Sequence, residues 1–304
     1  MTKPSLATQI AGITLQNPLL PASGTYGYGR EYLPFFTPDI FGAVVTKGVA
    51  VQPWTGNPPP RVCETPSGML NAIGLQNPGV EHFIAEALPF LRQYTVPVIV
   101  NVVGKTIDEY VAVVERLNEC PEISGYELNI SCPNVKEGGI AFGTQPCMVY
   151  EVTTAVRKAT QRPLIVKLSP NVTDITQMAQ QVEAAGADAV SLINTLLGMK
   201  IDLRRRRPFL GNTVGGLSGP AIKPVALRMV WQVYQKVKIP IIGMGGITSA
   251  EDALEFIMAG ASAIAIGTAM FRDPAVPQKI LAGIEEFLVK EGVCNLLELK
   301  GAAH

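Results

Sequence analysis

Short apolar runs alternate with longer amphipathic stretches along most of the chain. The run PVIVNVV at 97–103 is followed at 106–120 by TIDEYVAVVERLNEC, which is typical of a helix. The same alternation returns five more times, with expected strands and helices at 125–131 and 148–160, 163–169 and 174–186, 187–194 and 220–237, 239–246 and 249–260, and 261–268 and 276–290. These runs are apolar nearly throughout, as parallel strands covered on both faces are. The pattern predicts six consecutive βα units.

Two earlier runs, at 17–23 and 42–48, bring the expected strands to eight. Eight strands with intervening helices predict a closed (β/α)8 TIM barrel of the α/β class rather than an open sheet. The segment 6–18 predicts a small N-terminal β-hairpin that caps the bottom of the barrel. Long insertions follow strand 2 at 49–80 and strand 6 at 195–218, and loops of this length usually form lids or binding surfaces.

The composition agrees with one barrel domain that spans residues 1–304. Hydrophobic residues make up 47% of the chain and charged residues only 16%, so the core is well supplied and the surface is poor in charge. A surface poor in charge suggests that another subunit covers part of it. The 25 basic and 25 acidic residues balance, so the chain as a whole lacks the positive charge typical of nucleic-acid binding.

The cysteines and the N-terminal segment bear on the location of the protein. Its cysteines show no CxxC spacing, and they are Cys63, Cys120, Cys132, Cys147 and Cys294. This argues against a disulfide framework or a metal site. No apolar run reaches about 18 residues, and the N-terminus lacks the apolar core of a secretory signal. We therefore expect reduced thiols, a cytoplasmic location and no contact with membranes.

In a barrel of this class, chemistry takes place at the carboxyl ends of the strands. Every expected strand ends in polar or glycine residues, which are Ser23, Lys47, Asn101, Asn129, Lys167, Asn194 with Thr195, Gly245 with Gly246, and Gly267 with Thr268. Each of them alone could simply cap a strand or a turn. All eight strand ends together predict a functional rim.

The glycines and one lysine indicate what this rim binds. Glycines after strands 7 and 8 let backbone N–H groups approach an anion, and phosphate commonly binds there. Lys167 ends an apolar strand, where an unpaired ammonium is costly to bury. A fixed positive charge there would stabilise an anionic reduced flavin, so FMN fits both features. No strand is followed by GxGxxG, which argues against nicotinamide binding by this chain.

Six segments closely resemble dihydroorotate dehydrogenases, over about residues 5–290. They are ELNISCPN (127–134), NAIGLQNPG (71–79), VKLSPNVTDI (166–175), LINTLLGMKID (192–202), GGLSGPAIKPVALR (215–228) and GMGGITSAEDALEFIMAGASAIAIGTA (243–269). The resemblance implies an FMN-containing barrel that oxidises (S)-dihydroorotate to orotate in de novo pyrimidine (UMP) biosynthesis.

The resemblance also extends to one branch of the family. The membrane-bound class has an apolar N-terminal extension and a serine base, whereas this chain has neither and resembles class 1 through Cys132. SCPNVKEGG at 131–139 and the insertion after strand 6 resemble its B type. That type is the catalytic subunit of a complex whose second subunit carries FAD and a [2Fe–2S] cluster and passes electrons to NAD+. One FMN per chain and a homodimer of catalytic subunits within a heterotetramer are then expected.

The family's motifs, matched residue by residue, imply two sets of contacts. The FMN contacts are Ser23, Lys47, Gly48, Asn101, Asn129, Lys167, Ile193, Gly219, Gly245, Gly246, Gly267 and Thr268. The substrate contacts are Lys47, Asn71, Ala72, Ile73, Gly74, Leu75, Asn129, Asn134, Asn194 and Thr195. The amides can pair with ring N–H and C=O groups, because asparagine offers both a donor and an acceptor.

Cys132 is expected to be the catalytic base. The reaction removes a proton from C5 and a hydride from C6; flavin N5 takes the hydride, so the base must face the other side of the ring. His82 lies in an expected helix and His304 is the last residue, so neither suits. A thiol is a feasible base if its neighbours favour the thiolate. The other four cysteines are expected to be inert.

Three points stay open at the level of sequence. An FMN barrel like that of dihydropyrimidine dehydrogenase would act on a substrate without the carboxylate. A non-redox phosphate-binding barrel would carry no flavin. The run RRRR at 204–207 predicts either a solvated or phosphate-facing loop or a contact with a partner subunit.

Overall fold

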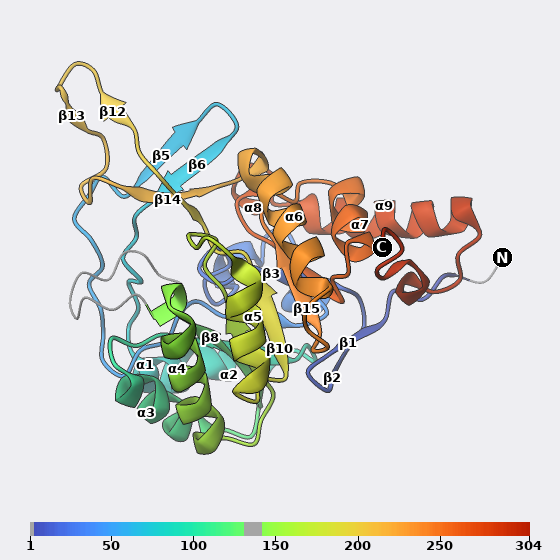
Figure 1. The fold of residues 1–304 in the computed structure, drawn as a ribbon, viewed down its shortest axis with the longest axis horizontal. Coiled ribbons are helices and arrows are strands. Elements are labelled where there is room, and N and C mark those ends of the chain that lie inside the picture. Colours follow the sequence, from blue (N-terminus) through green and yellow to red (C-terminus); the bar gives the residue numbers. More distant parts are fainter. Residues whose placement is uncertain (1–2, 131–141) are drawn as a thin grey trace.

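The computed structural model describes residues 3–130 and 142–304. Its central sheet has eight parallel strands in the order β3 (Leu19–Pro21), β16 (Ala263–Ile266), β15 (Ile241–Met244), β10 (Ala189–Leu192), β9 (Leu164–Lys167), β8 (Ile123–Asn129), β7 (Val98–Val102) and β4 (Val44–Val45). The backbone N–H of Gly42, next to β4, donates to the carbonyl oxygen of Leu19 in β3 at 2.8 Å and joins the two edges. The predicted (β/α)8 barrel is confirmed (Figure 1).

Alternate side chains of these strands enter two different cores. One set fills the barrel interior and includes Leu20, Val45, Ile99, Ile165 and Ile242. The other set packs outward against the surrounding helices. Both faces of each strand are therefore covered, which is why the strands are apolar along their whole length.

The N-terminal hairpin closes the bottom of the barrel, as predicted. It consists of β1 (Thr8–Ile10) and β2 (Ile13–Leu15), which pair in antiparallel fashion. Ile10 and Leu15 are fully buried and belong to the interior core. The two side chains fill the end of the barrel opposite to the end where the strands lead into the functional rim.

The helices around the barrel follow the predicted ranges within a few residues. The longer ones are α3 (Ile107–Asn118), α4 (Pro146–Ala159), α5 (Ile175–Ala184), α6 (Lys223–Tyr234), α7 (Ala250–Met258) and α9 (Val276–Glu291). The shorter ones are η1 (Arg30–Tyr32), η2 (Pro38–Ile40), α1 (Val80–His82), η3 (Phe83–Ala87), α2 (Leu88–Leu91), η4 (Phe142–Thr144), η5 (Pro220–Ile222), α8 (Ala269–Arg272) and η6 (Leu296–Leu299). Helices α3, α5 and α7 begin at side-chain caps, which satisfy exposed backbone donors of their first turns.

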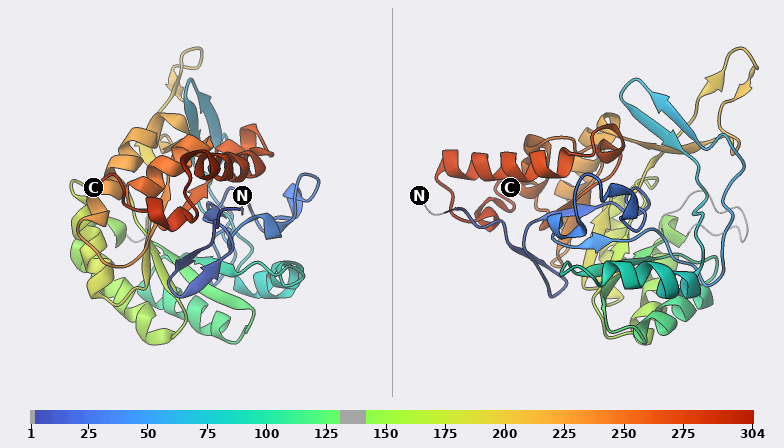
Figure 2. Two further views of the ribbon diagram at one scale, coloured as in Figure 1. Left: turned by 90° about the vertical axis from the view of Figure 1, so that its right-hand side faces the viewer. Right: turned by 180° about the vertical axis from the view of Figure 1, so that it is seen from behind.

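The two long insertions fold together into a second sheet. Strands β5 (Val62–Thr65) and β6 (Gly68–Asn71) come from the first insertion, and β11 (Leu196–Gly198) and β14 (Gly215–Ser218) from the second. They pair in the order β11-β14-β6-β5. This sheet projects from the barrel on the side away from β1 and β2 (Figure 2). The sequence predicted the insertions but not their pairing.

A further hairpin extends from this sheet. It is formed by β12 (Ile201–Asp202) and β13 (Arg207–Pro208). The arginine run 204–207 forms part of its tip and continues into β13. All four arginines are exposed. None of the helices in the described parts of the chain is long and apolar enough to cross a membrane.

Candidate functional site

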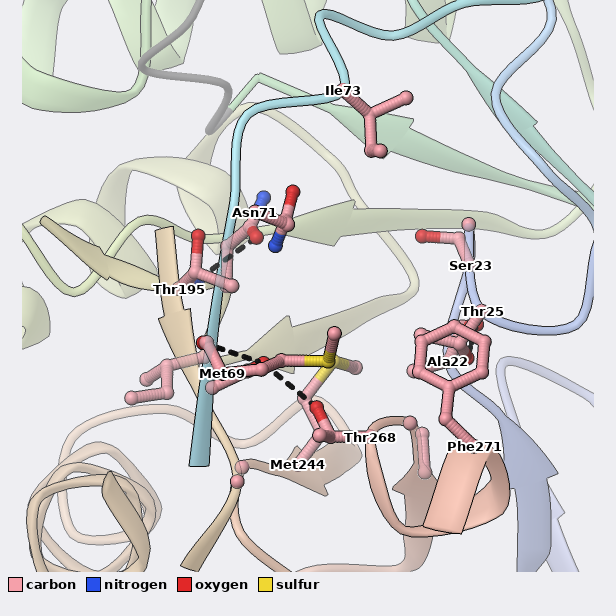
Figure 3. A pocket seen from close by; sticks show the side chains of 18 of the residues that line it. Ala22, Ser23, Thr25, Met69, Asn71, Ile73, Thr195, Met244, Thr268 and Phe271 are labelled. Atoms are coloured by element: carbon pink, nitrogen blue, oxygen red, sulfur yellow. Dashed lines mark hydrogen bonds between the residues drawn. The ribbon is translucent and has the colours of Figure 1, made fainter. Parts of the chain in front are cut away.

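A cavity of about 400 Å³ opens at the carboxyl ends of the barrel strands, beneath the second sheet. This volume is within the usual range for small-molecule sites. All the predicted FMN contacts line it, namely Ser23, Lys47, Gly48, Asn101, Asn129, Lys167, Ile193, Gly219, Gly245, Gly246, Gly267 and Thr268. Ser23 and Phe271 lie on one side of the view in Figure 3, and Asn71 and Thr195 lie on the other.

Lys167 is the buried cation of this cavity. It is the last residue of β9, and its side chain is only 4% exposed. Its Nζ donates a hydrogen bond to Oγ of Ser23, just beyond β3, at 3.1 Å. Strands β9 and β3 lie on opposite sides of the eight-stranded barrel, so the ammonium reaches across the cavity floor. Among the described residues, the Ser23 hydroxyl is the hydrogen-bond acceptor of this buried ammonium, which is therefore well placed to meet an anionic ligand.

Two amides and one carboxyl group line up beside this lysine on β7 and β8. Asn129 is the last residue of β8 and Asn101 is the last but one of β7, and both are almost fully buried. Asn101 Nδ2 donates to Oε2 of Glu127 at 2.6 Å, and Asn129 Nδ2 donates to Oδ1 of Asn101 at 3.5 Å. The backbone oxygen of Asn129 accepts from the Tyr110 hydroxyl at 2.9 Å. These bonds fix the amides at the cavity wall.

The glycines after β15 and β14 form a cradle that side chains would fill. Gly246 has φ +77°, and a Cβ there would lie 2.8 Å from the Gly219 oxygen and from Lys223. Gly219 has φ +96°, and its Cβ would lie 2.7 Å from the Cα of Gly68. Both positions therefore need glycine for conformation and for space. The backbone is left accessible to a ligand, as a phosphate group requires.

The loop 71–75 brings most of the predicted substrate contacts to the cavity. Asn71, Ile73, Gly74 and Leu75 line it, and so do Asn194 and Thr195 from the segment after β10. Ala72 does not line the cavity: its side chain is fully buried in the small core of the second sheet. The alternation of side chains along an extended segment places Ala72 on the far face.

A residue that the sequence analysis did not single out organises this loop. The Asn77 side chain is 4% exposed, and its Oδ1 accepts from the backbone N–H groups of Ala50 and Gly79. Its Nδ2 donates to the carbonyl oxygen of Leu75 at 2.8 Å. Asn77 thereby ties the loop to the segment after β4. The sequence feature that could have pointed to Asn77 is its position within the NAIGLQNPG motif.

Lys47 is the second cation of the cavity. It follows β4 and is half-buried. Burial lowers the pKa of Lys47; the carboxylate of Glu31 partly offsets this effect and the positive charge of Arg61 adds to it. An anionic group bound nearby would favour the charged form. Lys47 is therefore suited to hold a carboxylate.

Further lining residues come mainly from the second sheet and from the loops after β3 and β15. Sequence reasoning missed them because they belong to apolar or small residue types, including Ala22, Thr25, Val62, Met69, Met244, Ile247 and Phe271. Met69 and Val62 belong to β6 and β5, where only a loop was expected. The cavity wall therefore consists of these apolar side chains together with the polar residues at the strand ends.

Cys132 and Asn134 lie outside the described residues. Of the other cysteines, Cys63 and Cys120 are buried, whereas Cys147 and Cys294 are exposed. None of these four lines the cavity. The arginines 204–207 also lie away from the cavity lining, which removes the phosphate-facing interpretation for this site. No cluster of three or more metal-ligating side chains occurs in the described ranges.

The residues present fit FMN. The glycine cradle after β15 and β14 could hold its phosphate, and the buried Lys167 with Asn101 and Asn129 could hold the ring across the barrel. These groups come from opposite halves of the barrel, so an elongated ligand with an anionic end would reach both. The structure supports a cofactor of this shape and charge.

Comparisons with known proteins bear on the same site. The family model "Dihydroorotate dehydrogenase" matches residues 5–288. A Geotalea daltonii protein named "Dihydroorotate dehydrogenase B (NAD(+)), catalytic subunit" is 59% identical over 302 residues, which cover 99% of each chain. A protein of the same name from Geobacter sulfurreducens is 56% identical with the same coverage.

A solved structure agrees in fold. The crystal structure of a DHODH from Eimeria tenella in complex with ferulenol superposes with a TM-score of 0.83 at 23% identity, covering 98% of this chain and 88% of that one. The full-length relatives confirm the resemblance to the B type that the sequence motifs indicated. The chain belongs to the dihydroorotate dehydrogenase family.

Proposed function

We propose that this chain is the FMN-containing catalytic subunit that oxidises (S)-dihydroorotate to orotate in de novo pyrimidine biosynthesis. One observation carries the proposal: a buried Lys167 lies in a cavity between a glycine cradle and two buried amides. The names of the close relatives support the reaction. We further propose that residues 1–304 form one FMN-binding domain that acts in the cytoplasm.

Different residues of the chain have different roles in the proposed reaction. FMN, when bound, supplies the acceptor for the hydride that leaves C6 of the substrate. Lys167 places a positive charge beside the ring, and Asn101 and Asn129 orient ring and substrate through donor and acceptor groups. Lys47 holds the substrate carboxylate with the loop 71–75. Cys132, three residues after Asn129, takes the proton from C5.

A partner subunit completes the proposal. The relatives are named as catalytic subunits of an NAD(+)-linked enzyme, which supports a separate subunit for electron transfer. That partner would carry FAD and a [2Fe–2S] cluster and pass electrons to NAD+. The exposed arginines 204–207 project on the β12–β13 hairpin, and a contact with the partner is the remaining interpretation of this run beside a solvated loop. Two catalytic subunits and two partners would form the heterotetramer.

The purified chain tests the reaction and the cofactor. Release of the cofactor should yield FMN and not FAD, and dihydroorotate should bleach the flavin under anaerobic conditions. The chain alone should reduce artificial dyes, and NAD+ reduction should need the partner. Protein without flavin would favour the non-redox barrel, and a preference for a dihydropyrimidine without the carboxylate would favour the dihydropyrimidine dehydrogenase type. Strong activity with fumarate would contradict the B type.

The role of Cys132 has its own test. Cys132→Ala should keep FMN and orotate binding, while flavin reduction by dihydroorotate falls roughly 10²- to 10⁴-fold, the usual contribution of a positioned base. The reduction rate of the parent should rise with pH through one thiol ionisation that this variant lacks. Cys147→Ala, at an exposed position outside the cavity, is the matched control and should keep the parental profile. Near-parental bleaching by Cys132→Ala would place the base elsewhere.

A further inference from the structure

Glu127 is a buried carboxyl group to which the proposed function gives no role. It is 1% exposed and lies on β8 two residues before Asn129, so both side chains point into the barrel. Its Oε2 accepts from Nδ2 of Asn101 at 2.6 Å, and its Oε1 accepts from Oγ of Ser191 at 2.8 Å. Glu127 thus connects β8 to β7 and β10 just below the cavity.

These bonds decide which way the Asn101 amide faces. A carboxylate can only accept hydrogen bonds, so Asn101 must turn its NH₂ group toward Glu127. The Oδ1 of Asn101 is then left on the cavity side, where it accepts from Nδ2 of Asn129 at 3.5 Å. A Cβ built at Gly48 would lie 3.3 Å from the same Oδ1. The orientation of both amides therefore depends on Glu127.

The carboxyl group of Glu127 also lies in the barrel interior, two residues further from the cavity along the strand direction than Lys167. Glu127 is opposite Ile165 in the β8–β9 register, and Asn129 is opposite Lys167. Side chains two residues apart on a strand share a face, so Glu127 and Lys167 both belong to the barrel interior at successive levels. Lys167 attracts negative charge on a ligand in the cavity. The negative charge of Glu127, below the same cavity, opposes this attraction.

We propose that Glu127 is a positioning residue for the flavin, an inference that rests on the proposed FMN function. Through Asn101 it presents an acceptor, rather than a donor, to the cavity. Through its charge it disfavours additional negative charge on the reduced flavin and so keeps the midpoint potential low. Neither role is expected of a carboxyl group that only crosslinks the barrel strands.

The substitution Glu127→Gln tests both roles with little change of shape. Glutamine replaces one of the two carboxylate oxygens by an NH₂ group. Where this NH₂ group faces Asn101, Asn101 turns its own oxygen away from the cavity. We expect FMN to bind about tenfold more weakly. We also expect the preference for reduced over oxidised FMN to rise about tenfold, which corresponds to a midpoint potential about 30 mV higher for a two-electron couple.

The matched control is Ser191→Ala. It removes the second hydrogen bond to Glu127 but keeps the carboxylate and its bond to Asn101. The potential should therefore stay at the parental value, even where thermal stability falls. In an Asn101→Ala background, Glu127→Gln should no longer change FMN affinity, because the residue through which it acts is gone.

Three results would overturn the inference. The first is a folded Glu127→Gln protein with parental FMN affinity and potential, and the second is an equal shift of potential in Ser191→Ala. If Glu127→Gln does not fold, the variant Glu127→Asp replaces it, because aspartate keeps the charge but withdraws it from Asn101. We expect this variant to have the parental midpoint potential and weaker FMN binding. Parental FMN affinity in Glu127→Asp is the third result that would overturn the inference. A parent protein that binds no FMN would instead refute the proposed function itself.

Discussion

The ammonium of Lys167 donates a hydrogen bond to the hydroxyl of Ser23 at 3.1 Å, from one side of the barrel to the other. The two residues are 144 positions apart in the sequence, so only the closed barrel brings them together. Their bond spans the floor of the cavity, and because the hydroxyl is neutral, the positive charge of Lys167 is not compensated by this bond and can act on a ligand.

Removal of this charge should weaken cofactor binding. In Lys167→Ala, we expect the Kd for FMN to rise roughly 10- to 100-fold, which is about 1.4 to 2.8 kcal/mol. Flavin fluorescence during titration with FMN would measure it. Lys236→Ala, which removes an exposed lysine remote from the cavity, is the control and should bind FMN as the parent does. An unchanged Kd in Lys167→Ala would remove the proposed role.

The glycine cradle makes a second prediction. In Gly246→Ala, the methyl group would meet the Gly219 oxygen and Lys223, and FMN binding should be lost or fall at least tenfold. The positive φ adds strain of about 1–2 kcal/mol. Gly292→Ala is the matched control, because it has a similar φ of +69° but nothing within 4 Å of its Cβ. Urea unfolding should show the strain of the positive φ in both variants and a larger loss of stability in Gly246→Ala, whose methyl group also meets backbone atoms. Calorimetry should show lost FMN binding only in Gly246→Ala.

Lys47 predicts a pH dependence of product binding. Orotate should bind best when Lys47 is charged, and burial lowers the pKa of this lysine. Affinity should therefore fall as the pH rises through a value below the ordinary lysine pKa of about 10.4. Arginine stays charged in this range, so Lys47→Arg should lack the effect. Orotate affinity is measured against pH for both proteins. Any ionisation of orotate itself affects both equally and drops out of the difference between them. Identical pH profiles of the two proteins would contradict the prediction.

Asp252 should matter for stability, because it braces the loop after β15. It accepts from the Lys223 ammonium and from the backbone N–H groups of Thr248 and Ser249. Burial raises the pKa of Asp252, but the hydrogen bonds from Lys223 and Thr248 outweigh it, so the pKa lies below its usual value. The folded state is then stabilised above about pH 4, and this contribution is lost as the pH falls through the lowered pKa.

The variant Asp252→Asn should lower the free energy of unfolding by about 1–3 kcal/mol at neutral pH. The difference from the parent should shrink as the pH falls below the usual aspartate range. Urea unfolding at both pH values would show this. Glu255→Gln is the control, because Glu255 pairs with Lys223 at an exposed position and should contribute little. An equal loss in both variants would contradict the role given to Asp252.

The barrel itself could be predicted from sequence because its strands and helices depend on local patterns. The run at 97–103 and the helix after it show this, and Ile10 and Leu15 in the N-terminal hairpin occupy the position expected of them. The rim residues also followed, because each ends a strand and all strands of a closed barrel end on the same side.

The rest depends on contacts that no local pattern records. The pairing of β6 with β14 joins segments about 145 residues apart, so the apolar lining from Met69 and Val62 could not be foreseen. Ala72 was expected at the substrate, but the second sheet turns it inward. Glu127 stood within the ELNISCPN motif, yet its role appears only when Asn101 and Ser191 are seen beside it.

The second sheet has a consequence for protein engineering. Its outer strands β5 and β11 each depend on an inner strand, and the two inner strands, β6 and β14, come from different insertions. A chimera that received only one insertion from a relative would leave an inner strand with an unmatched edge above the cavity. The insertions after β4 and β10 therefore form a single exchangeable unit, and a transfer of substrate preference between relatives requires both of them together.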